Sequence, residues 1–180
     1  NDLKNQIGYK KSIKKIEAYD ISHISGDHAV ASCIVFSNEG PCKKEYRTFN
    51  IPRELSGNDV GSLEHVIQRR IKYYDNKEIK PDLILIDGGS NQLNFSQSVI
   101  HNSEHNDIKV ISIVKGINRI RATETVLSKD GIIEFKKESK GYLLLQEIRD
   151  ESHRFAINAQ RKKKNAKNKK SQLDKINGIG

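Results

Sequence analysis

The sequence has only two cysteines and no long run of apolar residues. Cys33 and Cys42 are too few for a disulfide scaffold, and neither has the spacing of a metal ligand. Cys33 lies inside an apolar run and is expected to be a small core residue. No apolar segment approaches the length of a membrane span, and the first residues do not form a signal-peptide pattern. These absences favour a protein of a reducing, cytoplasmic compartment.

The sequence also lacks an internal repeat and an initiating methionine, since it begins at Asn1. We therefore expect a fragment of a longer protein. With 180 residues, the chain is long enough for one well-buried core. We expect an N-terminal lead-in over residues 1–15, a folded domain over 16–160, a basic linker over 161–172 and the start of another module over 173–180.

Acidic residues are absent from the most basic segment, RKKKNAKNKK, residues 161–170. Seven of its ten residues are basic, and the net charge of the chain is +9, so the rest of the chain is nearly neutral. Such a run is either a solvated tail or an arm that binds phosphates by releasing counterions from a nucleic acid. A membrane-surface role fits less well, because no aromatic or leucine-rich face accompanies the charges.

Three β-type runs open the folded part: KIEAYDIS (15–22), AVASCIVFS (29–37) and KEYRTFNI (44–51). Their short connections, GDH and NEGP, predict an antiparallel meander. Apolar residues from Leu63 to Tyr74 then recur at helical spacing, with Arg69, Arg70 and Lys72 on other faces.

Two near-continuous apolar runs follow, DLILID (82–87) and IKVISIV (108–114), and each is typical of a strand buried on both faces. SNQLNFSQSVIHN (90–102) lies between them and predicts a helix. A hairpin near SKDGIIEF (128–135) and a last helix from about Tyr142 to Arg161 complete the pattern. It predicts an α/β fold with a mixed sheet of about five strands, an antiparallel meander plus parallel strands, and flanking helices. The order resembles the ribonuclease H-like fold, although a flavodoxin-like sheet is also compatible.

Two carboxylates stand where these strands are expected to end. Asp20 interrupts the first apolar run, and Asp87 ends the strand before Gly88 and Gly89. In open α/β sheets, function collects at the carboxyl ends of strands, and two carboxylates there suit Mg²⁺ or Mn²⁺. The alternatives are that Asp20 caps a turn or faces water, and that Asp87 caps the next helix or belongs to a turn before Gly88 and Gly89. The glycine pair could also cradle a phosphate.

The last predicted helix contains IRDESHRF, in which Arg149, Asp150 and His153 lie on adjoining faces. His153 could bind the metal or accept a proton from an attacking water, or it could be an exposed histidine paired with Asp150. Asp59, in SGND before a helix, is either a capping residue or a further carboxylate of the site.

Taken together, the motifs resemble the C-terminal endonuclease domain of the UvrC family, a component of the bacterial excinuclease ABC. The resemblance covers about Ile16 to Gly180 and rests on YDISH, ASCIVF, GP, YRTFNI, DLILIDGG with QL after it, VKG and IRDESHRFAI with the basic run behind it. The closing LDKINGIG resembles the start of a helix-hairpin-helix module.

The resemblance implies a ribonuclease H-like domain whose site is Asp20, Asp87 and His153, with Asp59 as a further carboxylate. It implies metal-dependent hydrolysis of a DNA phosphodiester on the 5′ side of a lesion during nucleotide excision repair. The implied partners are damaged double-stranded DNA and UvrB, with UvrA upstream in the pathway. The expected DNA contacts are Arg149, Arg154, Arg161, Lys162, Lys163 and Lys164.

The chain departs from the family in two places. Ser90 and Asn91 stand where the family usually has Lys-Gly, and the segment after VKG, which contains Arg119, differs from the commonest family sequence. Two other functions remain compatible with the residues. One is a nucleic-acid-binding domain of the same fold without catalysis, and the other is a small-molecule or nucleotide-binding α/β domain that uses IDGGS as a phosphate loop.

Overall fold

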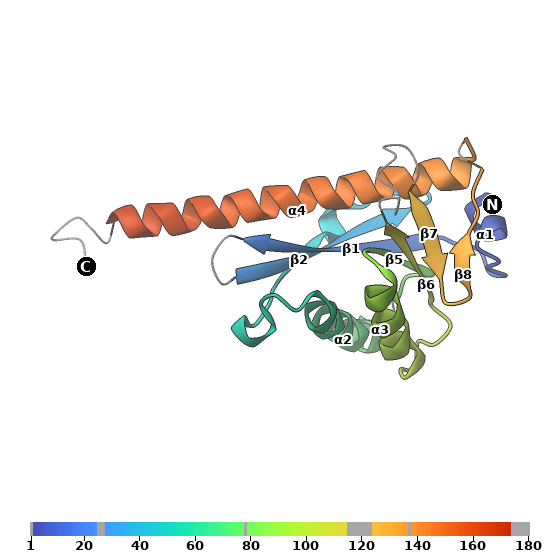
Figure 1. The fold of residues 1–180 in the computed structure, drawn as a ribbon, viewed down its shortest axis with the longest axis horizontal. Coiled ribbons are helices and arrows are strands. Elements are labelled where there is room, and N and C mark those ends of the chain that lie inside the picture. The colour runs from blue at the N-terminus through green and yellow to red at the C-terminus, as the bar shows by residue number, and fades with distance from the viewer. Residues whose placement is uncertain (1, 25–27, 78, 115–123, 137, 174–180) are drawn as a thin grey trace.

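The computed structural model describes residues 2–24, 28–77, 79–114, 124–136 and 138–173, which form a sheet between two helical layers (Figure 1). Its strands are β1 (Lys15–Ile24), β2 (His28–Ser37), β3 (Gly40–Pro41), β4 (Arg47–Asn50), β5 (Leu83–Asp87), β6 (Lys109–Val114), β7 (Thr125–Ser128) and β8 (Gly131–Ile133). Its helices are α1 (Asp2–Gln6), α2 (Asp59–Lys77), α3 (Ser90–His101) and α4 (Lys140–Leu173), with short 3-10 helices η1 (Lys43–Glu45) and η2 (Arg53–Leu55).

The strands form one mixed sheet in the order β3-β2-β1-β5-β6-β7-β8, and β4 also pairs with β2. β1 is antiparallel to β2 and parallel to β5, and β5 is parallel to β6. The predicted mixed α/β sheet is therefore confirmed. Within the described residues it has eight strands rather than about five, because β3 pairs with β2 and the β7–β8 hairpin extends the edge at β6.

Helices cover both faces of the sheet. α2 and α3 lie on one face, and α4 with α1 lies on the other (Figure 1). Alternate residues of each strand point to opposite faces. In β1, Tyr19 therefore belongs to the core under α2 and α3, whereas Ile16 and Ala18 belong to the core under α4. Burial on both faces explains why the central strands contain almost continuous apolar runs.

The last helix is longer than the sequence pattern predicts. An end near Arg161 is wrong, because α4 continues to Leu173 and extends past the ends of β1 and β2 (Figure 1). Lysine and alanine are good helix formers, and the sequence has no glycine or proline between Gly141 and Gly178 to stop the helix. Of the described helices, none is long and apolar enough to cross a membrane.

A buried ion pair joins the sheet to α2. Glu17 of β1 is fully buried, and Arg70 of α2 donates to both of its carboxylate oxygens. The hydroxyls of Tyr19 and Tyr74 also donate to Glu17, at 2.6 and 2.5 Å. The sequence pattern predicts that Arg70 lies off the apolar face of α2, and this prediction is wrong. Arg70 is 5% exposed, since it lies four residues before Tyr74 on the same face.

Candidate metal centre

Asp20 lies at the point where β1 loses its neighbour β5. The β1–β5 pairing ends at Tyr19 and Ile86, whereas β1 remains paired with β2 as far as Ile24. Asp20 is therefore inside β1, and the expectation that it ends this strand is wrong. The carboxylate stands at the end of the parallel pairing, on the face that α4 covers, and its residue is only 7% exposed.

Asp87 is the last residue of β5 and pairs with Ile113 of β6. It follows Leu83 and Leu85 at the same alternation, so its side chain also faces α4. Because Tyr19 pairs with Ile86, the next residues of the two strands, Asp20 and Asp87, are neighbours at this edge. This is the arrangement that the sequence predicts for two carboxylates at the ends of adjacent parallel strands.

The two glycines after Asp87 are used by the fold itself. Gly88 N–H donates to the carbonyl of Ile113 at 3.2 Å, and Gly89 N–H donates to Oε1 of Gln92 at 2.7 Å. Gly89 is the N-cap of α3, so Asp87 does not cap that helix. A Cβ on Gly88 would lie 2.1 Å from Gln92 Oε1. Since both amides have acceptors, this turn is poorly suited to cradle a phosphate.

His153 reaches the two carboxylates from α4. Its Nδ1 atom lies 3.4 Å from Oδ2 of Asp20. Asp150, the other predicted partner of this histidine, pairs instead with Arg149. The side chain of His153 is 56% exposed and that of Asp20 is 10% exposed, so the imidazole stands on the open side of the site.

The convergence of these three side chains is the main feature of the site. One ligand atom from each of Asp20, Asp87 and His153 lies within 4.8 Å of the others. Two carboxylate oxygens and an imidazole nitrogen form a donor set that suits a divalent ion. Ser32, the cross-strand partner of Asp20, has a buried hydroxyl without a hydrogen-bond partner among the described residues. The residues present therefore fit a hydrated divalent metal ion.

Contacts on both sides of His153 join α4 to Tyr46, which lies just before β4, and link neighbouring turns of α4. Tyr46 donates from its hydroxyl to Glu151 at 3.1 Å, and its ring meets that of Phe155 edge-on at 5.0 Å. Arg154 donates twice to Glu151, at 2.7 Å each, and these bonds lower the pKa of the Glu151 carboxyl. These contacts fix the turn of α4 that carries His153.

Asp59 is the first residue of α2 and is not one of the three converging residues. Asn58 before it accepts from Gly61 N–H at 2.9 Å and so acts as the cap of α2. The capping role considered for Asp59 therefore belongs to Asn58. A catalytic role for Asp59 stays a prediction.

The predicted DNA contacts divide into two groups along α4. Arg149 pairs with Glu124 and Asp150, and Arg154 pairs with Glu151, so both guanidinium groups already have carboxylate partners. The second group is Arg161, Lys162, Lys163 and Lys164. Arg161, Lys162 and Lys164 are exposed, whereas Lys163 is half-buried and donates to Asn50 at 2.8 Å.

Sequence reasoning missed Ser32, although its signal was present in the pairing of the first two strands. Once β1 and β2 are taken as a hairpin, the residue opposite Asp20 follows from the register.

Several predicted features lie outside the described residues. They are the turn around Gly26, Lys115 of VKG, the loop around Arg119, and residues 174–180 of the predicted helix-hairpin-helix module.

The chain is similar to one known protein family and to its members. The family profile described as the UvrC RNAse H endonuclease domain matches residues 4–157. UvrABC system protein C of Legionella pneumophila (strain Paris) is 39% identical over 180 residues. That of Pseudomonas putida (strain KT2440) is 38% identical over 181 residues. Each alignment covers 99% of this chain and 29% or 30% of the relative, so the chain spans less than a third of those proteins.

Among solved structures, Ciona intestinalis endonuclease V in complex with an inosine-containing DNA aligns with 61% of this chain and 48% of its own. The sequence identity is 16% and the TM-score is 0.43.

Proposed function

The chain belongs to the UvrC RNase H endonuclease domain family, and we propose that it makes the 5′ incision beside a DNA lesion in bacterial nucleotide excision repair. The observation that carries this proposal is the convergence of Asp20, Asp87 and His153 within 4.8 Å. The three residues come from β1, β5 and α4, which meet only in the folded domain.

We propose that Asp20, Asp87 and His153 hold Mg²⁺ or Mn²⁺. A bound divalent ion polarises a phosphate and makes a nucleophile from water at neutral pH. The two carboxylates stand on adjacent strands of a sheet that is buried on both faces, so they are held in a fixed relation. His153 completes the ligand set or accepts a proton from the attacking water. Asp59 is proposed as a further carboxylate near the substrate.

The open side of this site is the proposed path of the substrate. His153 is more exposed than Asp20, so a phosphodiester would approach past the imidazole and over α4. The cations that follow on the same helix, Arg161 to Lys164, would hold the DNA backbone without reading its sequence. Arg149 and Arg154 could contribute after exchanging their carboxylate partners.

The relatives' name, UvrABC system protein, supports an assembly with UvrB, with UvrA acting upstream on damaged double-stranded DNA. We propose that this activity takes place in the bacterial cytoplasm.

We also propose the domain limits given above: a lead-in over 1–15, the nuclease domain over 16–160, a basic segment over 161–172 and a helix-hairpin-helix module from 173. The helical state of residues 161–173 supports a stiff arm rather than a flexible linker.

An incision assay tests the proposal. The whole protein that contains this chain is mixed with UvrA, UvrB, a lesion-bearing duplex and Mg²⁺ or Mn²⁺. We expect Asp20→Asn and Asp87→Asn to abolish the 5′ cut and leave DNA binding unchanged. Asp130→Asn, at an exposed turn between β7 and β8, is the matched control and should cut normally. A normal 5′ cut by either site variant would overturn the proposal.

A further inference from the structure

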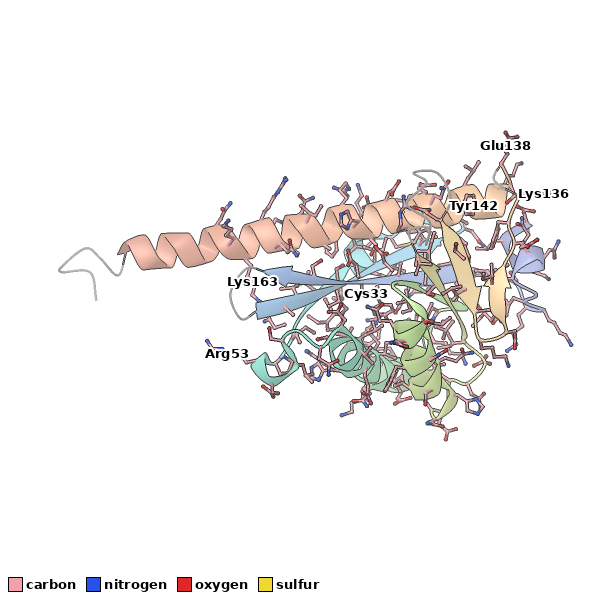
Figure 2. The ribbon with its side chains drawn as sticks, viewed as in Figure 1. Cys33, Arg53, Lys136, Glu138, Tyr142 and Lys163 are labelled. Atoms are coloured by element: carbon pink, nitrogen blue, oxygen red, sulfur yellow. The ribbon has the colours of Figure 1, made fainter. Side chains whose placement is uncertain are left out.

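A groove of about 720 Å³ lies between α4 and the strands β2 and β4. Its apolar lining includes Val30 of β2 with Phe155 and Ala159 of α4. Lys163 spans from α4 to Asn50 of β4, and Figure 2 shows it extending from the helix toward the ends of the first two strands. The groove is therefore bounded by the sheet on one side and by the helix on the other.

The polar residues that line the groove are uncharged on the sheet side. On the helix side they are asparagines together with basic residues. Thr48 and Asn50 come from β4, and Asn158 and Asn165 come from α4. Amides and hydroxyls of this kind donate to phosphate oxygens and sugars without a preference for sequence. An apolar surface beside them suits the faces of sugars and bases.

The charge of the groove has one sign. Arg161, Lys162 and Lys163 line it, and among the described lining residues none carries a carboxylate. Elsewhere on α4, Arg149 and Arg154 are neutralised by neighbouring carboxylates. Along the groove, basic residues of α4 therefore gather without acidic partners in the described lining. This positive charge is complementary to a polyanion.

The groove lies on the same face of the sheet as the metal centre but on the other side of α4: at about 100° per residue, Phe155 and Lys162 lie about 160° and 180° around the helix from His153. Val30 is two residues from Ser32, the cross-strand partner of Asp20, and shares its face of the sheet. On α4, Asn158 lies five residues after His153, and Arg161 lies eight residues after it, or about 12 Å along the helix axis. A chain of phosphates that left the metal centre and crossed the exposed side of α4 beside Arg161 would enter the groove.

We propose that this groove holds the DNA strand being cut, over the nucleotides on one side of the scissile phosphate. The proposal rests on the proposed function, because it takes the strand in the metal centre to be DNA. Phosphates lie against Arg161, Lys162 and Lys163, and Asn50 and Asn158 donate to the backbone between them.

Binding measurements without divalent metal test this role apart from cleavage. The probe is a labelled single strand of about 16 nucleotides. Asn158→Asp keeps the shape of the side chain but places a carboxylate among the phosphates. We expect it to weaken binding by about tenfold. Asn106→Asp, in an exposed turn before β6, is the matched control and should bind as the unchanged protein does. Unchanged affinity in Asn158→Asp would overturn the groove proposal.

A cross-linking experiment locates the strand. Asn158 is replaced by a photoreactive phenylalanine in the Asp20→Asn protein, which is then bound to a lesion-bearing duplex with UvrA and UvrB. We expect cross-links to one strand, within a few nucleotides of the incision position and on one side of it. Cross-links scattered along both strands, or none, would contradict the proposal.

The two proposals fail in different ways. If Asp20→Asn protein still makes the 5′ cut, the proposed function falls, whatever the binding data show. If Asp20→Asn abolishes the cut but Asn158→Asp binds the strand normally, the proposed function stands and only the groove is wrong.

Discussion

The Nδ1 atom of His153 lies 3.4 Å from Oδ2 of Asp20, although 133 residues separate the two positions in the chain. Asp20 is almost fully buried in a central strand, and His153 is on the exposed side of the long last helix. Their contact therefore depends on the packing of α4 on the sheet. The site exists only when this helix is docked.

His153→Ala should lower the rate of metal-dependent cleavage by about a hundredfold or more, because it removes a ligand or proton acceptor of the site. Adding His153→Ala to Asp20→Asn should cause little further loss, since residues that act as one unit are not additive. Single-turnover cleavage rates check both statements. His101→Ala, at an exposed position at the end of α3, is the control. Independent, multiplying losses would show that the two residues do not share a site.

Breaking the buried Glu17–Arg70 pair should destabilise the domain. Arg70→Leu leaves a buried carboxylate without its cation and should lower the free energy of unfolding by about 3–5 kcal/mol. Glu17→Leu with Arg70→Leu should recover much of this loss, because the isolated charge is gone. Urea unfolding measures both. If Arg70→Leu does not fold, Arg70→Lys offers a milder change with a smaller expected loss. A double variant as unstable as the sum of its parts would contradict this account.

Asp107 should contribute a small, pH-dependent stabilisation. Hydrogen bonds from Lys11 and Lys80 lower its pKa from 3.8 to about 2. A lowered pKa means that the contribution is complete above pH 3.8 and is lost as the pH falls toward 2. The side chain is 36% exposed, so solvent screening limits the effect to about 1 kcal/mol or less. Asp107→Asn should therefore be slightly less stable at pH 7, and the difference should narrow below pH 3.8. A difference that grows with acidification would contradict the assignment.

The two cysteines should differ sharply in reactivity. Burial, and then the nearby Glu17 carboxylate, raise the pKa of the Cys33 thiol well above its ordinary value. Since the thiolate is the reactive form, Cys33 should resist a thiol reagent in the native protein. Cys42 is only partly buried and should react. Cys42→Ser protein should therefore label only on unfolding, and labelling at native rates would show that Cys33 is accessible.

The sequence allowed the carboxylate side of the metal centre to be predicted because Asp20 and Asp87 each had a local signal. Asp87 ends a typical buried strand, and Asp20 interrupts another, so a parallel pairing of the two strands brings them together. His153 had no such signal by itself. Its role was predicted from the family motif around it, since its face of α4 depends on packing that periodicity does not determine.

Other features could not be predicted because they depend on partners distant in the sequence. Glu17 is a charged residue in an apolar strand, and only the position of α2 reveals that Arg70 and two tyrosines surround it. The groove beside the metal centre combines β4 with the part of α4 that was expected to be a linker. The pattern indicated a basic run there but not that the run continues the last helix past the ends of β1 and β2.

Manganese binding tests the central claim most directly, because it needs neither DNA nor partner proteins. In a titration followed by electron paramagnetic resonance, the signal of free Mn²⁺ reports the fraction that is not bound. We expect the unchanged protein and the Asp130→Asn control to bind Mn²⁺ alike. Asp20→Asn and Asp87→Asn should each weaken binding by about tenfold or more. Equal Mn²⁺ affinity in all four proteins would contradict a metal centre at Asp20, Asp87 and His153.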